Sequence, residues 1–189
     1  MSNFNINERG FWESSTDEGH LHDPNLCQGL ITVLEHIKAK KIADFGCGMG
    51  DYAKKISEQG IICEAYDGNP NTVELTSNFA QVLDLSKDFN LNKIYDAVIS
   101  LEVGEHIPKE FESIFINNLC KHTNQILILS WAVIGQGGDG HVNCQNNDYI
   151  IEQLSSRGFR IDIMRSNFLR QVSYLPWFKN TIMVFEKNK

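Results

Sequence analysis

The chain has 189 residues, of which 42% are hydrophobic and 22% are charged, and its formal net charge at pH 7 is −7. This composition indicates a single globular domain over residues 1–189 and argues against a disordered chain. The negative charge disfavours long nucleic acids as partners, because phosphate contacts need clustered lysine and arginine side chains.

The five cysteines are odd in number and widely spaced, and none forms a CxxC pair. This spacing argues against a zinc site and favours reduced thiols in a cytoplasmic protein. The N-terminus lacks the apolar core of a signal peptide, and no apolar run is long enough to span a bilayer. We therefore expect a cytoplasmic protein without a membrane partner. No pattern in the sequence indicates its oligomeric state.

The first 24 residues are polar, and we expect them to form an N-terminal cap over the active site. From there, apolar periodicity and turn residues predict helices at 24–37, 51–59, 71–79, 109–122 and 147–158. They predict strands at 42–45, 61–66, 80–83, 95–100, 125–130, 159–164 and 181–186, the last two joined by an aromatic-bearing segment. This order predicts an α/β fold: a doubly wound, mostly parallel seven-stranded sheet with a C-terminal antiparallel hairpin.

The segment from Lys41 to Tyr52 combines a strand, a glycine-rich turn and the start of a helix. The glycines let the backbone approach a ligand, which the free N–H groups of the helix can face. A phosphate loop of the GxxxxGK[ST] type is excluded, because no Lys-Ser or Lys-Thr pair follows. The dinucleotide pattern GxGxxG would need a glycine where the chain has Asp51, whose carboxylate would face a pyrophosphate. This position disfavours an NAD-linked oxidoreductase.

Three aspartates, Asp44, Asp67 and Asp84, follow the first three predicted strands. A turn aspartate commonly caps the next helix, but ligands of open α/β sheets also bind beyond the carboxyl ends of the strands. A carboxylate at Asp67 can accept hydrogen bonds from both hydroxyls of a ribose, and Asp84 is placed to accept from an exocyclic amine such as that of adenine. Their succession therefore predicts an adenosine-type site.

The pattern Asp-x-Gly-x-Gly-x-Gly at 44–50 resembles the first motif of the class I S-adenosylmethionine (SAM) dependent methyltransferases. The segments EAYDGNP, QVLDL and YDAVISLEVGEHIP look like the second, third and fourth motifs, and the resemblance covers roughly residues 30–186. It implies a Rossmann-like methyltransferase fold, SAM as cofactor and methyl transfer as the reaction. The cofactor-binding residues it implies are Asp44, Gly46, Cys47, Gly48, Gly50, Asp67, Gly68, Asp84, Leu85 and Leu101.

Four further residues are candidates for catalysis. Methyl transfer to a hydroxyl requires an aligned acceptor and a general base. Glu102, Glu105 and His106 follow the fourth strand and would share one face if that segment were helical. His106 is the candidate base, because the ordinary pKa of histidine is nearest to neutral. His141 lies in the glycine-rich loop 131–145, which follows the neighbouring strand and can approach the same end of the sheet. We expect Gln136 and Asn143 of this loop to contact the acceptor as well.

The set Glu102, Glu105, His106 and His141 also offers the mixed nitrogen and oxygen ligands that suit a divalent metal. It is similar to the metal set of the methyltransferases that modify the terminal 2′-hydroxyl of small RNAs. However, the further histidines of that family are absent around His141, and a Glu-His-Ile run also occurs in metal-free small-molecule methyltransferases. We therefore assign no metal ligand.

Together these patterns predict a cytoplasmic SAM-dependent methyltransferase that acts on a hydroxyl of a small polar molecule. Two alternatives remain open: 2′-O-methylation of an RNA end or cap-like structure, and a non-catalytic SAM-binding module.

Overall fold

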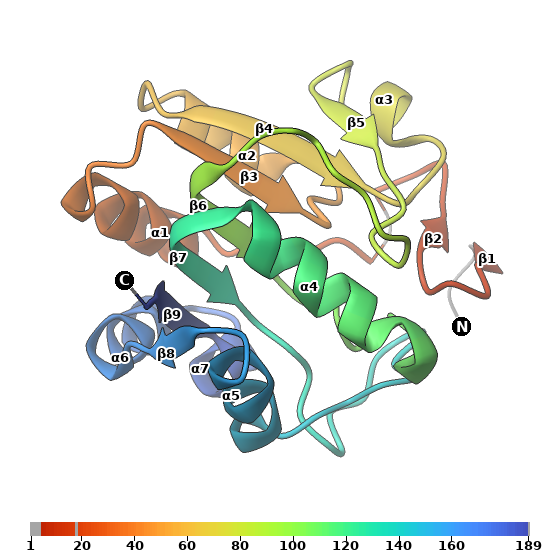
Figure 1. Cartoon of the computed structure of the whole chain (residues 1–189). Coiled ribbons are helices and arrows are strands. Elements are labelled where there is room, and N and C mark those ends of the chain that lie inside the picture. The colour runs from red at the N-terminus through yellow and green to blue at the C-terminus, as the bar shows by residue number, and fades with distance from the viewer. Residues whose placement is uncertain (1–4, 18, 189) are drawn as a thin grey trace.

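A computed structural model describes residues 5–17 and 19–188 of the chain. A seven-stranded sheet in the order β5-β4-β3-β6-β7-β9-β8 forms the middle layer, with helices on both faces (Figure 1). Its strands are β3 (Lys41–Phe45), β4 (Ile62–Asp67), β5 (Ala80–Val82), β6 (Tyr95–Ser100), β7 (Thr123–Leu129), β8 (Phe159–Ile161) and β9 (Met183–Lys187). The helices are α1 (Pro24–His36), α2 (Asp51–Ser57), α3 (Thr72–Leu75), α4 (Glu112–His122), α5 (Asn147–Ser155), α6 (Ile163–Val172) and α7 (Phe178–Thr181), with a 3-10 turn η1 (Lys109–Phe111).

The pairing of the strands confirms the predicted fold class. β3 pairs in parallel with β4 and β6, β4 with β5, and β6 with β7. β9 runs antiparallel to both of its neighbours, β7 and β8. The sheet is therefore doubly wound and mostly parallel, with antiparallel pairing at its C-terminal end.

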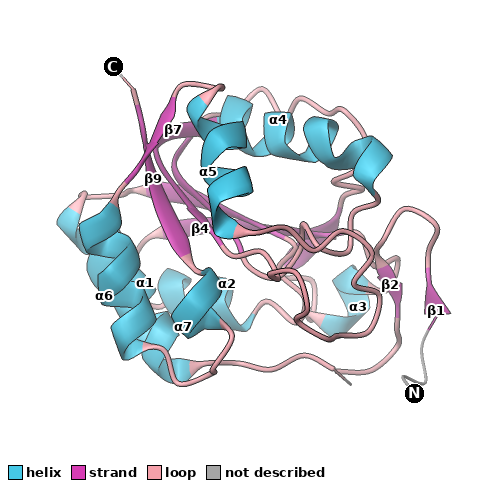
Figure 2. Ribbon diagram, turned by 90° about the horizontal axis from the view of Figure 1, so that it is seen from below, coloured by secondary structure: helices cyan, strands magenta, loops and turns pink. Residues whose placement is uncertain are grey.

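Two hydrophobic clusters hold the helices on the sheet, and Figure 2 shows the helices that contribute to them on opposite faces. Along β7, Leu127 belongs to the cluster with α4 and α5, while its neighbours Ile126 and Ile128 belong to the cluster with α1, α6 and α7. This alternation follows from the strand period of two, and it explains why the strand is apolar throughout.

The turn between β3 and α2 has the conformation that its glycines allow. Gly46 and Gly50 have positive φ angles of 85° and 75°. A Cβ atom at Gly46 would lie 2.2 Å from the Val103 side chain, so no larger residue fits there. The close packing brings the turn against the segment that follows β6.

Three predicted elements differ from the structure. The helix predicted at 71–79 ends after α3, because Ser77 and Asn78 adopt left-handed φ angles of 56° and 65°. The strand predicted at 159–164 ends at Ile161, since Asp162 caps α6 by accepting a hydrogen bond from the backbone N–H of Arg165. The segment expected to join the last two strands therefore contains the helices α6 and α7.

The N-terminal part of the chain forms a small hairpin of β1 (Asn5–Ile6) and β2 (Trp12–Glu13), which the sequence did not predict. Residues 1–4 and 18 of the predicted cap lie outside the described residues. Within 5–17 and 19–188, none of the helices has both the length and the apolar character needed to cross a bilayer.

Candidate active site

A pocket of about 400 Å³ opens at the carboxyl ends of the central strands. Its lining includes every predicted cofactor-binding residue except Gly50, and it also includes Glu102, His106 and His141. Gly50 instead occupies the N-cap position of α2 in a left-handed conformation, where it sets the start of the helix. The pocket thus joins the strand-end aspartates to Glu102, His106 and His141, whereas the buried Glu105 does not line it.

Asp67 connects β4 to the glycine turn. Its Oδ2 accepts a hydrogen bond of 2.8 Å from the backbone N–H of Gly48, and its Oδ1 accepts one of 2.9 Å from that of Asn69. The carboxylate therefore fixes the turn as well as facing the pocket.

Asp44 is the most deeply buried of the three strand-end aspartates, with 3% of its surface exposed. Its Oδ2 has no hydrogen-bond partner among the described residues. Burial, and then the nearby Asp67, raise the pKa of Asp44 to about 7. Such a carboxyl group is suited to a cationic ligand group, whose charge would favour its ionised form.

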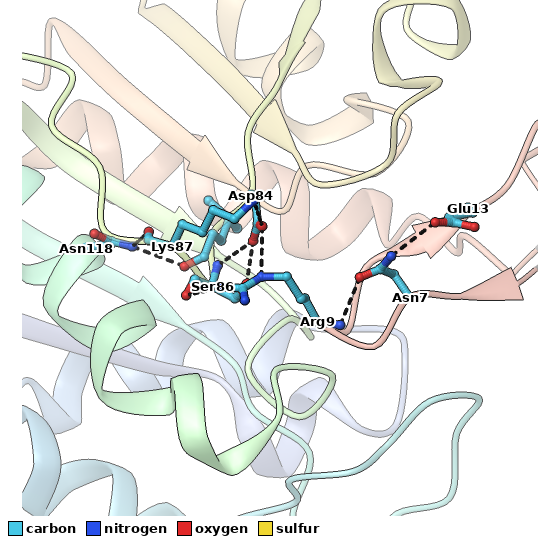
Figure 3. A network of polar contacts seen from close by, with 8 residues as sticks. Asn7, Arg9, Glu13, Asp84, Ser86, Lys87 and Asn118 are labelled. Atoms are coloured by element: carbon cyan, nitrogen blue, oxygen red, sulfur yellow. Dashed lines mark hydrogen bonds and ion pairs between the residues drawn. The ribbon is translucent and has the colours of Figure 1, made fainter.

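Asp84 is already engaged with other parts of the protein. Its Oδ2 lies 3.0 Å from Arg9 Nε and 3.1 Å from Lys87 Nζ, and its Oδ1 accepts a hydrogen bond of 3.0 Å from the backbone N–H of Ser86 (Figure 3). Although burial alone would raise its pKa, the hydrogen bonds from Ser86 and Lys87 and the charge of Arg9 lower it overall. An adenine amine would have to share the carboxylate with these donors.

The segment after β6 is not helical, so Glu102, Glu105 and His106 do not share the face of a helix. Glu102 has a left-handed φ of 53°, and its backbone N–H donates to Ser130 Oγ at 2.7 Å. The turn nevertheless gathers three of the four candidate residues. One ligand atom each from Glu105, His106 and His141 lies within 4.8 Å of the other two.

Burial shifts the pKa values of this cluster in opposite directions. Burial and the neighbouring Glu102 raise the pKa of Glu105. Burial also raises the pKa of Glu102. Burial, followed by the effect of His141, lowers the pKa of His106 to about 4. His106 is therefore neutral at pH 7 and has a lone pair that can accept a proton or a hydrogen bond.

The donors of Glu105, His106 and His141 fit a divalent metal in type and spacing. Among the described residues, both carboxylate oxygens of Glu105 and Nδ1 of His106 are buried without a hydrogen bond. Glu102, the fourth candidate ligand, instead accepts a hydrogen bond of 2.8 Å from Gln136 Nε2. The candidate set for a metal is thus reduced to three residues.

The glycine-rich loop contributes less to the pocket than the sequence predicts. Gln136 and His141 line the pocket, but Asn143 does not, and only 4% of its surface is exposed. Its carbonyl accepts a hydrogen bond of 2.7 Å from Trp131 Nε1, and its amide donates one of 2.9 Å to Glu112 Oε2. The predicted acceptor contact at Asn143 is therefore wrong, and the residue anchors the loop.

Residues 5–17 and 19–23 supply much of one wall of the pocket. The Trp12 ring lies 5.5 Å from the His106 ring and 5.2 Å from the His20 ring, measured between centroids. The sequence patterns did not predict that Arg9, Phe11 and Trp12 line the pocket. The only local signal was the Asn7–Gly10 turn, because the contacts themselves join residues far apart in the chain.

Comparison with known proteins identifies the family of the chain. Residues 20–131 match the family described as a methyltransferase domain. The ubiquinone biosynthesis O-methyltransferase of Rickettsia typhi is 31% identical over 147 residues, which are 69% of this chain and 58% of that protein. The chain thus spans a little under three fifths of the length of this relative.

Solved structures show the same fold at low sequence identity. Magnesium protoporphyrin IX methyltransferase from Synechocystis PCC 6803, with bound SAH (S-adenosylhomocysteine), has a TM-score of 0.66 at 20% identity, covering 86% of this chain and 82% of that one. The sugar N-methyltransferase KedS8 from Streptoalloteichus has a TM-score of 0.69 at 12% identity, covering 93% and 98%. The chain belongs to the methyltransferase-domain family, which confirms the family predicted from its glycine turn and strand-end aspartates.

Proposed function

We propose that the protein transfers the methyl group of SAM to a hydroxyl group of a small polar molecule. One observation carries this proposal: a single pocket joins the glycine turn, Asp44 and Asp67 to Glu102, His106 and His141. Methyl transfer is an in-line displacement, so the donor carbon and the acceptor oxygen must meet within one cavity.

The cofactor end of the pocket supports binding of SAM. Asp44 would pair with the ammonium of the methionyl part, and Asp67 would accept hydrogen bonds from the ribose hydroxyls. Leu85 and Leu101, which also line the pocket, would lie beside the adenine ring. SAM has no phosphate group, so two carboxylates close to the turn would not repel it.

The acceptor end supports deprotonation of a hydroxyl. As the acceptor oxygen forms its bond to the methyl carbon, the carbon–sulfur bond breaks and its electron pair stays on sulfur, which gives SAH. The hydroxyl proton passes to the lone pair of the neutral His106, which lies beside Glu105 and His141. His141 would orient the acceptor from the opposite side of the cluster.

The size of the pocket and the names of the relatives support the acceptor class. A cavity of about 400 Å³ suits a cofactor and a small acceptor. The similar proteins of Rickettsia are named O-methyltransferases, which supports oxygen as the acceptor atom. All five cysteines are free thiols, which supports a reducing compartment such as the cytoplasm.

Calorimetric titration with SAM and SAH, with NADH as control, tests the cofactor. Binding of the first two but not of NADH is expected. A screen with methyl-labelled SAM then compares hydroxyl compounds, their amine analogues and short RNA ends, each with EDTA and with added Mn²⁺ or Zn²⁺. Labelling of small hydroxyl compounds is the expected result. Exclusive labelling of RNA ends or of amines would refute the acceptor class.

A further inference from the structure

The N-terminal hairpin, residues 5–13, is tied together at both its strands and its turn. Asn5 pairs with Glu13 and Ile6 with Trp12. The Asn7 side chain accepts a hydrogen bond of 2.9 Å from the backbone N–H of Arg9 and donates one of 3.2 Å to Glu13 (Figure 3). This arrangement presents the Arg9 side chain at the tip of the hairpin.

Arg9 inserts into a defined socket formed by Asp84, Ser86 and Phe111. Its Nε lies 3.0 Å from Asp84 Oδ2 and 2.8 Å from Ser86 Oγ, and its Nη2 donates to the carbonyl of Ser86 at 3.0 Å. The guanidinium carbon lies 4.1 Å from the centre of the Phe111 ring. The two charged side chains are only 24% and 19% exposed, so this ion pair is shielded more than a surface pair.

The socket is itself held by the protein body. The side-chain amide of Asn118, on α4, donates to the carbonyls of Leu85 at 3.1 Å and Lys87 at 2.7 Å (Figure 3). Because Ser86 is fully buried, the socket is a fixed anchor for the hairpin tip.

Next to Arg9, the hairpin touches both ends of the pocket. A Cβ atom at Gly10 would lie 2.0 Å from the carbonyl oxygen of His106, and one at Gly68 would lie 2.6 Å from Phe11. Gly68 follows Asp67 at the cofactor end, whereas His106 belongs to the acceptor end. One short segment thus spans the two halves of the site.

We propose that Arg9 is a positioning residue that latches the N-terminal hairpin over the occupied pocket, so that cofactor binding and hairpin docking stabilise each other. This inference rests on the proposed function. A two-stranded hairpin is marginally stable alone and depends on its contacts with the body. A cofactor bound beneath the hairpin gains contacts only in the docked state, and this linkage is reciprocal.

The test uses the full chain with SAH as the probe. Arg9→Gln removes the ion pair while keeping a polar side chain of similar length. Loss of charge-assisted hydrogen bonds should make SAH dissociation roughly tenfold faster in stopped-flow chase experiments. Hydrogen exchange of residues 5–17 should increase in the variant, and the protection that SAH gives these residues should shrink. Arg9→Lys keeps the charge but not the fork of donors, so its SAH dissociation rate should lie between those of the wild type and Arg9→Gln.

Lys87→Gln is the matched control. Lys87 also pairs with Asp84, at 3.1 Å, but its side chain is 65% exposed and does not belong to the hairpin. This variant should keep the wild-type dissociation rate and exchange pattern, and both glutamine variants should keep the melting temperature within a few degrees.

If the wild type binds SAH but Arg9→Gln leaves SAH dissociation and hairpin exchange unchanged, the latch is refuted and the proposed cofactor is not. Equal effects of Arg9→Gln and Lys87→Gln would refute it too, because they would trace the effect to the charge of Asp84. Failure of the wild type to bind SAH would refute the proposed cofactor and the linkage together.

Discussion

The buried carboxyl group of Asp44 makes a quantitative prediction about cofactor binding. Its pKa is raised from 3.8 to about 7. At 1.36 kcal/mol for each pKa unit, ionising it in the ligand-free pocket costs about 4 kcal/mol relative to water. The ammonium of SAH would remove this cost by pairing with the carboxylate, so binding should expel the proton that Asp44 carries below pH 7.

The affinity for SAH should therefore rise with pH. Between pH 5.5 and pH 7 we expect a roughly tenfold increase, and at pH 7 the release of about half a proton per SAH bound. Calorimetry in buffers of different ionisation enthalpy measures both quantities. The neighbouring Cys47, Cys63 and Tyr52 stay protonated in this window because burial raises their pKa values.

Asp44→Asn is the decisive variant. It should bind SAH more weakly at pH 7, with the pH dependence flattened. It should also change the stability of the ligand-free protein. Because the folded state holds the Asp44 proton between pH 4 and pH 7, this group makes the wild type less stable as pH rises through that range. The asparagine variant should lose that trend in thermal melts. An unchanged pH dependence of SAH binding in Asp44→Asn would refute the reasoning.

Three further substitutions test other parts of the site. His106→Asn should lower turnover by about 10²- to 10⁴-fold and leave SAH affinity nearly intact, as label transfer and calorimetry would show; full activity would remove it as the base. Asp67→Asn should weaken SAH binding by roughly tenfold, since a neutral amide accepts ribose hydroxyls less well, and wild-type affinity in calorimetry would exclude the ribose contact. Gly10→Ala and Gly60→Ala both place a Cβ at positive φ, at a cost of about 1–2 kcal/mol, but only the first meets a backbone atom, at 2.0 Å. Gly10→Ala should therefore lower the melting temperature further or release the hairpin in hydrogen exchange, and equal behaviour of the pair would contradict the close contact.

Local sequence patterns were sufficient for the sheet and for the cofactor end of the pocket. The β3 strand and the glycine turn are adjacent in the chain, so residue type and spacing specify them directly. The same holds for Asp67, which ends its own strand. The run from Ile161 to Met164 misled the prediction because apolar residues extended past the strand, and Met164 is 83% exposed at the start of α6.

The acceptor end depended on contacts that no local pattern contains. A Cβ at Gly104 would lie 2.2 Å from the Trp131 ring, so packing against a later strand end sets the turn that holds Glu105 and His106. The Arg9–Asp84 pair joins residues 75 positions apart. Charge and glycine content indicated which residues could contact one another at the acceptor end and at the hairpin. Only the fold determined which of these contacts form.

The placement of β9 between β7 and β8 has a consequence for how the chain is made. During synthesis on the ribosome, the strands from β3 to β8 emerge before Met183–Lys187, yet β8 has no partner other than β9 among the described strands. Until β9 arrives, β7 presents an apolar edge, Ile126–Leu129, with free backbone groups. A nascent or truncated chain that stops short of Met183 should therefore be prone to aggregation and to chaperone capture, even though its pocket residues have all been made.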